Sequence, residues 1–224
     1  MTSSNLLSVS NYLQWFGSFL IVVFVFAKRR GMQKQIFIIG IYAINSVVFQ
    51  CIQTGSYVIA KVHPNPIGNF YVLIETIILL WFFASAFNKL TFVRVMLLVG
   101  VLYTIIFVCF ALPDLYTIHS STRAVRDLVM IICSSLYFFL LLKNLPGEDL
   151  YTLPMFWISA AILFFFSCTF ILSLSTTYLI KTFRDQYVYF ASFRNLLRAL
   201  FCLIICLGIW KSQPFGNIKA GNSH

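Results

Sequence analysis

The sequence predicts an all-α polytopic membrane protein, a bundle of seven transmembrane helices with its N-terminus outside and its C-terminus in the cytoplasm. The chain of 224 residues is 60% hydrophobic and only 10% charged, and its mean hydropathy is +0.90. These values lie far outside the range of soluble domains. The apolar residues also form seven runs that can each cross a hydrocarbon core of about 30 Å.

The partners follow from the same composition. We expect a lipid bilayer around the bundle, because its exposed surfaces should be apolar all round. The net charge of +10 does not indicate nucleic acid, since the sixteen Lys and Arg residues are scattered between the apolar runs and form no basic face. They are better explained as a topology signal.

The first apolar run covers residues 12–27. It follows an uncharged segment and is succeeded at once by Lys28, Arg29 and Arg30. A cleaved signal peptide has the opposite order, with its positive charge before the apolar core. We therefore expect a retained first helix that begins outside.

The later runs have short connections, so no soluble domain is expected between them. They cover residues 36–60, 69–87, 92–112, 124–142, 154–174 and 187–210. The prolines all fall in connections or at helix ends, and the cysteines all lie inside the runs, where they act as small apolar residues. We expect one helical domain over residues 1–211 and a disordered cytoplasmic tail over residues 212–224.

The orientation follows from the Lys and Arg residues of the connections, which are more abundant on the cytoplasmic side. The first, third and fifth connections and the tail contain nine: Lys28, Arg29, Arg30, Lys34, Lys89, Arg94, Lys143, Lys211 and Lys219. The second, fourth and sixth contain five: Lys61, Arg123, Arg126, Lys181 and Arg184. This difference places the C-terminus in the cytoplasm.

The last run carries two arginines and an asparagine, Arg194, Asn195 and Arg198. An arginine near the centre of a spanning helix costs about 2.5 to 3.5 kcal/mol, so each must face protein, an acid or water. Glu75 and Asp127 are the acids that lie in or beside other apolar runs. We expect Glu75 to pair with Arg198 or Arg194.

The third, fifth and seventh helices should run in the same direction, which brings their early residues into one layer in the outer half of the membrane. The late residues of the second helix should reach that layer too. At 100° per residue, Asn195 and Arg198 share one helix face, and Tyr71 and Glu75 share another. The candidate ligand-binding residues are Arg194, Arg198, Asn195, Glu75, Asp127, Gln53 and Tyr71.

Two interpretations of this layer remain open. The charges can form a structural ion pair that fixes helix register, with no ligand, although replacing a buried pair by apolar residues is often neutral for stability. They can also form an outward-facing pocket, because two arginines against one deep acid leave a cationic surplus that suits a small anionic or amphipathic ligand. We favour the pocket, in a receptor-like module that signals through a partner protein. No cofactor, metal or catalytic residue is expected.

Two alternatives belong to other classes. In a small-solute transporter, Glu75 and Asp127 would carry coupling protons. In an intramembrane lipid-modifying enzyme, one of these acids would be the general base. A retinal protein or a G-protein-coupled receptor is excluded by sequence. The last run has no lysine in its interior, since Lys211 lies at its inner end, and the Asp-Arg-Tyr and Asn-Pro-x-x-Tyr motifs are absent.

Three stretches carry a resemblance that covers almost the whole chain. They are FYVLIE (70–75), LPMFWISAAILFFFS (153–167) and the last helix with Asn195 and its closing LGIW (207–210). In them the chain resembles small, uncharacterised seven-transmembrane-helix membrane proteins of Bacteroidota. The resemblance implies a seven-helix fold in a bacterial inner membrane, and it implies no activity. Arg198 matches a position that is usually basic or an amide in that family.

Overall fold

The described residues of the computed structural model form seven α-helices and one short 3₁₀ helix, with no strand. The structure describes residues 3–28, 33–59, 61, 65–87, 89–117, 119–144, 150–182 and 186–212. The α-helices are α1 (Ser3–Ala27), α2 (Lys34–Val58), α3 (Asn65–Phe87), α4 (Leu90–Phe110), α5 (Ser120–Asn144), α6 (Pro154–Thr182) and α7 (Tyr187–Lys211). The 3₁₀ helix η1 covers Leu150–Thr152. All seven α-helices are long and apolar enough to span a membrane, as in a multi-pass integral membrane protein.

The helices differ from the expected apolar runs mainly at their ends. α1, α3 and α5 begin several residues earlier, and α6 continues to Thr182, because hydropathy marks only the apolar part of a helix. α4 ends at Phe110, two residues before the expected end. Pro113 disfavours the helical conformation of the residue before it, Leu112, which was the expected end. Pro66 and Pro154 stand in first turns, where the missing amide hydrogen is not needed.

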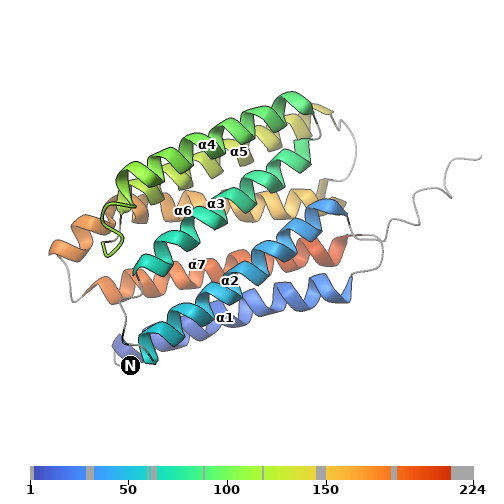
Figure 1. Cartoon of the computed structure of the whole chain (residues 1–224). Coiled ribbons are helices and arrows are strands. Elements are labelled where there is room, and N and C mark those ends of the chain that lie inside the picture. The colour runs from blue at the N-terminus through green and yellow to red at the C-terminus, as the bar shows by residue number, and fades with distance from the viewer. Residues whose placement is uncertain are drawn as a thin grey trace, which may run out of the picture.

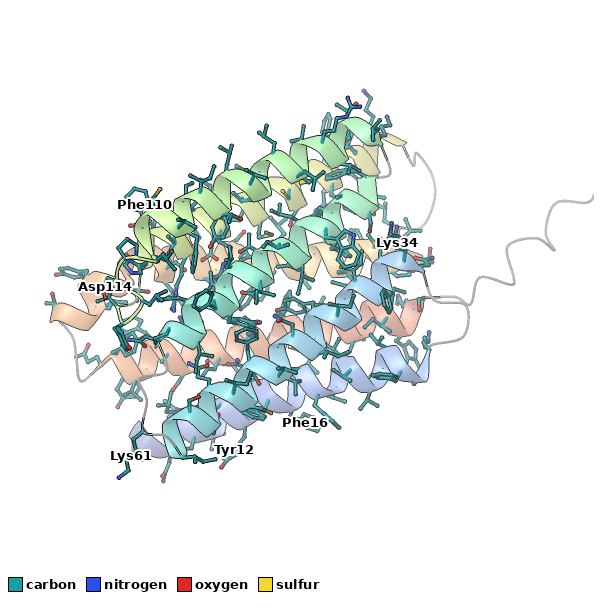
Figure 2. All side chains as sticks on the ribbon, in the orientation of Figure 1. Tyr12, Phe16, Lys34, Lys61, Phe110 and Asp114 are labelled. Atoms are coloured by element: carbon teal, nitrogen blue, oxygen red, sulfur yellow. The ribbon has the colours of Figure 1, made fainter. Side chains whose placement is uncertain are left out.

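Six of the helices form a closed ring, in the order α1, α2, α3, α5, α6 and α7, with α7 packed against α1. α4 lies outside this ring against α3 and α5 (Figure 1). Half of the apolar window of α3 is buried inside the bundle, against 17% for α4. The outward faces are apolar: Tyr12 and Phe16 of α1 point away from the bundle in Figure 2. In a bilayer, these faces contact lipid.

Aromatic residues fill the middle of the ring. Phe82, Phe83, Phe166 and Phe201 are fully buried, together with Tyr42. The polar layer lies beside this core, towards the end of the bundle that carries the N-terminus. Figure 2 shows Lys61 and Asp114 at that same end and Lys34 at the opposite one.

Side chains of the opposite end hold the closing turn of α7. Lys28 donates to the carbonyl oxygens of Trp210 and Ser212, the second at 2.8 Å, where a cation complements the helix dipole. Ser212 is itself buried and donates to the Ile209 carbonyl. Ser212 therefore packs against the bundle, although the disordered tail was expected to begin at this residue. The rest of the expected tail, residues 213–224, lies outside the described residues.

Candidate functional site

A cavity of about 490 Å³ lies among the six ring helices at the end of the bundle that carries the N-terminus. Four arginines line it: Arg123 and Arg126 from α5, and Arg194 and Arg198 from α7. Among the described residues that line the cavity, none is an acid. Glu75 and Asp127 are both 0% exposed, so these carboxylates lie behind the arginines.

Glu75 contacts two buried arginines and two tyrosines. It accepts hydrogen bonds from Tyr42 at 3.1 Å and from Tyr71 at 2.9 Å. It also forms ion pairs with Arg126 at 2.7 Å and Arg198 at 2.8 Å. One carboxylate of α3 therefore joins α2, α5 and α7, and all four of its partners are side chains.

Asp127 extends this network to α6. Its Oδ1 atom accepts from Arg126 Nε at 2.8 Å and from Nη2 at 2.7 Å. Its Oδ2 atom accepts from the Ser173 hydroxyl at 2.5 Å. Arg126 thus bridges two carboxylates with three hydrogen bonds. We call Glu75, Arg126, Asp127 and Arg198 the ion-pair network, and its formal charges sum to zero.

Aromatic rings surround the two cations of the network. The Arg198 guanidinium lies 5.8 Å from the Tyr42 ring, 5.3 Å from Tyr71 and 5.5 Å from Phe165. It also contacts the hydroxyl oxygens of both tyrosines. Cation–π contacts at these distances replace part of the water that a buried guanidinium loses. The Nε atom of Arg198 is buried without a hydrogen-bond partner among the described residues.

Arg123 and Arg194 form a second layer, which we call the arginine pair. Each precedes the network arginine of its own helix by three or four residues, which is about 4.5 to 6 Å along the axis. Arg123 is close enough to Arg194 and Arg126 to be repelled by both. No ion pair joins Arg123 or Arg194 to a carboxylate among the described residues, and Arg123 Nε is buried without a hydrogen-bond partner.

Small and uncharged polar residues flank the arginine pair. Gly68 lies beside it: a Cβ atom there would stand 4.0 Å from Arg123 Nη2 and 3.8 Å from the Gln53 side-chain nitrogen. Gln53 is exposed and lines the cavity. A Cβ atom at residue 68 would therefore make ordinary van der Waals contact with both side chains, and the glycine keeps this part of the cavity wall free of a side chain.

Asn195 lies at the seam between α7 and α1. Its amide nitrogen donates to Asn11 Oδ1 at 2.6 Å and to the Ser10 hydroxyl at 3.3 Å. Asn195 and Asn11 both line the cavity. The amide of Asn195 therefore holds one wall together and also faces the space.

No protein-family model, curated protein or solved structure matches the chain.

The cavity thus brings together five of the seven candidate residues: Arg194, Arg198, Asn195, Gln53 and Tyr71. The other two, Glu75 and Asp127, support the wall from behind. Of the two arginines considered as partners of Glu75, Arg198 makes the ion pair. Arg194 does not pair with a described acid. The layer therefore contains both a closed ion-pair network and an arginine pair that faces the cavity.

Arg123 and Arg126 were counted with the fourth connection, which was wrong for both, and the expected run 124–142 already included Arg126. Both lie inside α5, which begins at Ser120. A Ser or Thr residue before an apolar run is a helix-start signal. Applied to Ser120, that signal would have placed both arginines in the helix, three residues apart on one face. Nothing in the sequence singles out Tyr42 or Ser173, because tyrosine and serine are common in spanning helices.

The described lining of the cavity is positively charged and rich in hydrogen-bond donors. The described lining offers guanidinium, amide and hydroxyl groups, with apolar surface from Leu7, Trp15, Val72, Phe165 and Ala191. It includes no carboxylate, imidazole, thiol or amine. In the described part of the chain, no group of three His, Cys, Asp or Glu residues could hold a metal ion.

Proposed function

We propose that this protein is a ligand-binding membrane module, whose cavity receives the anionic group of a small or amphipathic molecule. One observation carries the proposal: four guanidinium groups line the cavity while both nearby carboxylates are fully buried behind them. Ionisable residues within membrane spans are by default candidates for function. Guanidinium forks match the oxygens of carboxylates and phosphates.

Charge balance supports an anion rather than a structural role for all four arginines. The ion-pair network is neutral by itself, so it serves the structural interpretation. The arginine pair adds two positive charges that no described carboxylate neutralises. Their repulsion is strengthened where protein and lipid lower the effective dielectric constant. A bound anion would remove this repulsion, and ligand binding would therefore be favourable.

Apolar lining supports an amphipathic ligand. Trp15 of α1 and Phe165 of α6 face the same space as the arginines. A ligand with an anionic end and an apolar body would contact both kinds of surface. Such mixed lining, with a few polar groups that set orientation, is typical of small-molecule sites.

We further propose that the cavity opens to the outside of a bacterial inner membrane. Arg123 and Arg126 lie within the membrane span, so they no longer count among the connections of the outer side. This leaves three basic residues there: Lys61, Lys181 and Arg184. The same rule removes Lys34, Arg94, Lys143 and Lys211 from the other side, where five of the nine remain. The positive-inside signal therefore keeps its direction. The resemblance in the last helix supports the bacterial source.

A receptor-like role follows from the shared position of Glu75. Arg126 of α5 and Arg198 of α7 both bind this one carboxylate of α3, and both line the cavity. An anion that engages either arginine would compete with Glu75 and alter the contacts between these helices. The basic connections at the opposite end would then transmit the change to a partner protein.

The test is a titration of the protein in a neutral maltoside detergent with decanoate, followed by tryptophan fluorescence, since Trp15 lines the cavity. Loss of one charge-assisted hydrogen bond costs about 1.5 to 3 kcal/mol, so Arg194→Gln should weaken binding about tenfold or more. The matched control is Arg94→Gln, on the exposed face of α4. Equal affinities of the wild type and Arg194→Gln would contradict the proposal. Decanoate-independent uptake of solutes into liposomes would instead favour a transporter.

A further inference from the structure

We propose that the arginine pair selects a doubly charged anion, and specifically a terminal phosphate group, as the part of the ligand that enters the cavity. This inference rests on the proposed function and names the ligand class of the same site. It starts from the two layers of charge, which differ in how they are neutralised.

The ion-pair network, which forms the inner layer, needs no charge from a ligand. Arg126 and Arg198 are matched by Glu75 and Asp127, with ion-pair distances of 2.7 to 2.8 Å. The outer layer is the arginine pair, which has two positive charges and no matched described carboxylate. A ligand group with two negative charges neutralises this layer, whereas a group with one leaves a net positive charge in the membrane interior.

The surroundings of Arg123 fit a group with several acceptor oxygens. Its Nε–H is buried and lacks a described partner, and a buried donor without a partner is unfavourable. Its side chain borders the cavity, next to Gly68, where the wall has no side chain and a Cβ atom would lie 4.0 Å from Arg123 Nη2. A tetrahedral group in this space can accept from Arg123 and from Arg194 of the facing helix with different oxygens.

Phosphate monoesters meet both conditions. Their second pKa is about 6, so they carry a charge of about −1.5 to −2 at neutral pH and present three strong acceptor oxygens. A carboxylate or a sulfate ester has a single charge. The phosphate can belong to a lipid headgroup or to a water-soluble ester, and both offer the same chemistry to the arginine pair.

The experiment compares phenyl phosphate with phenyl sulfate, which differ in charge but hardly in shape, by titration of the full-length wild-type protein in neutral maltoside. At about pH 7.5 phenyl phosphate should bind at least tenfold more tightly. At about pH 5 it becomes a monoanion, and the advantage should disappear while sulfate binding persists. This comparison needs no variant.

Two variants and one control variant locate the effect. Arg123→Gln should remove most of the preference for phosphate over sulfate, and Arg94→Gln should retain it. Gly68→Leu should block both probes, because its side chain fills the space beside Arg123. Thermal unfolding of each variant verifies that it is folded.

Two further probes distinguish the sources of the phosphate, and each supports the inference if it binds with the same pH dependence. Dihexanoyl phosphatidic acid binding more tightly than phenyl phosphate indicates a lipid headgroup. Inorganic phosphate binding equally well indicates a soluble ligand. Equal binding of phenyl phosphate and phenyl sulfate, with both weakened by Arg194→Gln, would overturn the doubly charged ligand and leave the anion site standing. No binding of any probe at either pH would overturn this inference, whereas the decanoate titration separately decides the proposed function.

Discussion

Replacing Glu75 by glutamine should expose how strongly the bundle depends on its buried charges. The substitution keeps the size of the side chain and removes one negative charge from a site that is 0% exposed. Arg126 retains Asp127, to which it donates twice, at 2.7 and 2.8 Å. Arg198 retains only the tyrosine hydroxyls, so it becomes the stranded cation.

The magnitude follows from the loss of one partner of a buried ion pair, which costs about 3 to 5 kcal/mol. Two charge-assisted hydrogen bonds to Glu75, each worth about 1.5 to 3 kcal/mol, give a similar range. In soluble proteins of this size, each kcal/mol lowers the melting temperature by about 2 to 4 °C. Glu75→Gln should therefore lower the melting temperature by about 6 to 20 °C.

When Glu75→Gln is combined with a second substitution, the effect on stability should differ between Arg198 and Arg126. Glu75→Gln with Arg198→Gln leaves the Arg126–Asp127 pair neutral and intact, so it should recover stability, with a coupling of about 1 to 3 kcal/mol. Glu75→Gln with Arg126→Gln deprives Asp127 of its cation and leaves Arg198 stranded, so no recovery is expected.

The assay is thermal unfolding in one neutral detergent, followed by circular dichroism. Asp114→Asn is the matched control, because this carboxylate is exposed, and it should change stability by less than about 0.5 kcal/mol. The reasoning is refuted if the double variant with Arg198→Gln is no more stable than the one with Arg126→Gln.

Two other predictions concern packing and topology. Gly17→Ala should destabilise the bundle by about 1 to 3 kcal/mol, since its Cβ would stand 2.9 Å from Cys202 Cβ. Gly55→Ala, with nothing within 4 Å of the added Cβ, should be neutral or stabilising. The reverse order of stability in thermal unfolding would contradict the α1–α7 packing. A green fluorescent protein fused to the C-terminus should fluoresce in bacterial cells, and an alkaline phosphatase fusion at the same place should be inactive. An active phosphatase would invert the proposed orientation.

The number of helices follows from sequence because hydropathy and length are sufficient in a bilayer. Each apolar run of this length is expected to be an α-helix, since backbone groups without hydrogen bonds are excluded from lipid. The shared layer of Glu75 and Arg198 also follows, because helices that run in the same direction bring residues at similar positions to the same depth. The depth of a residue in the membrane can therefore be predicted from its position along the chain, without knowledge of the neighbouring helices.

The rotation of each helix about its own axis cannot be predicted from the sequence in the same way. α3 and α6 are apolar on nearly every face, so periodicity cannot show which side meets another helix. Which arginine reaches Glu75 depends on these rotations, and the structure selects Arg126 and Arg198. Arg123 escaped prediction for a simpler reason: it lies in the polar first turn of α5, which the hydropathy boundary at residue 124 excludes. Arg126 lies inside that boundary but was counted with the connection before it.

The most direct test of the anion site is a crystal structure of the protein grown with sodium tungstate, a doubly charged tetrahedral oxyanion that scatters X-rays anomalously. The expected result is an anomalous peak between the guanidinium groups of Arg123 and Arg194, which disappears in Arg194→Gln crystals. Peaks confined to the outer surface, with only water beside Arg123, would contradict the proposal that this cavity binds an anion.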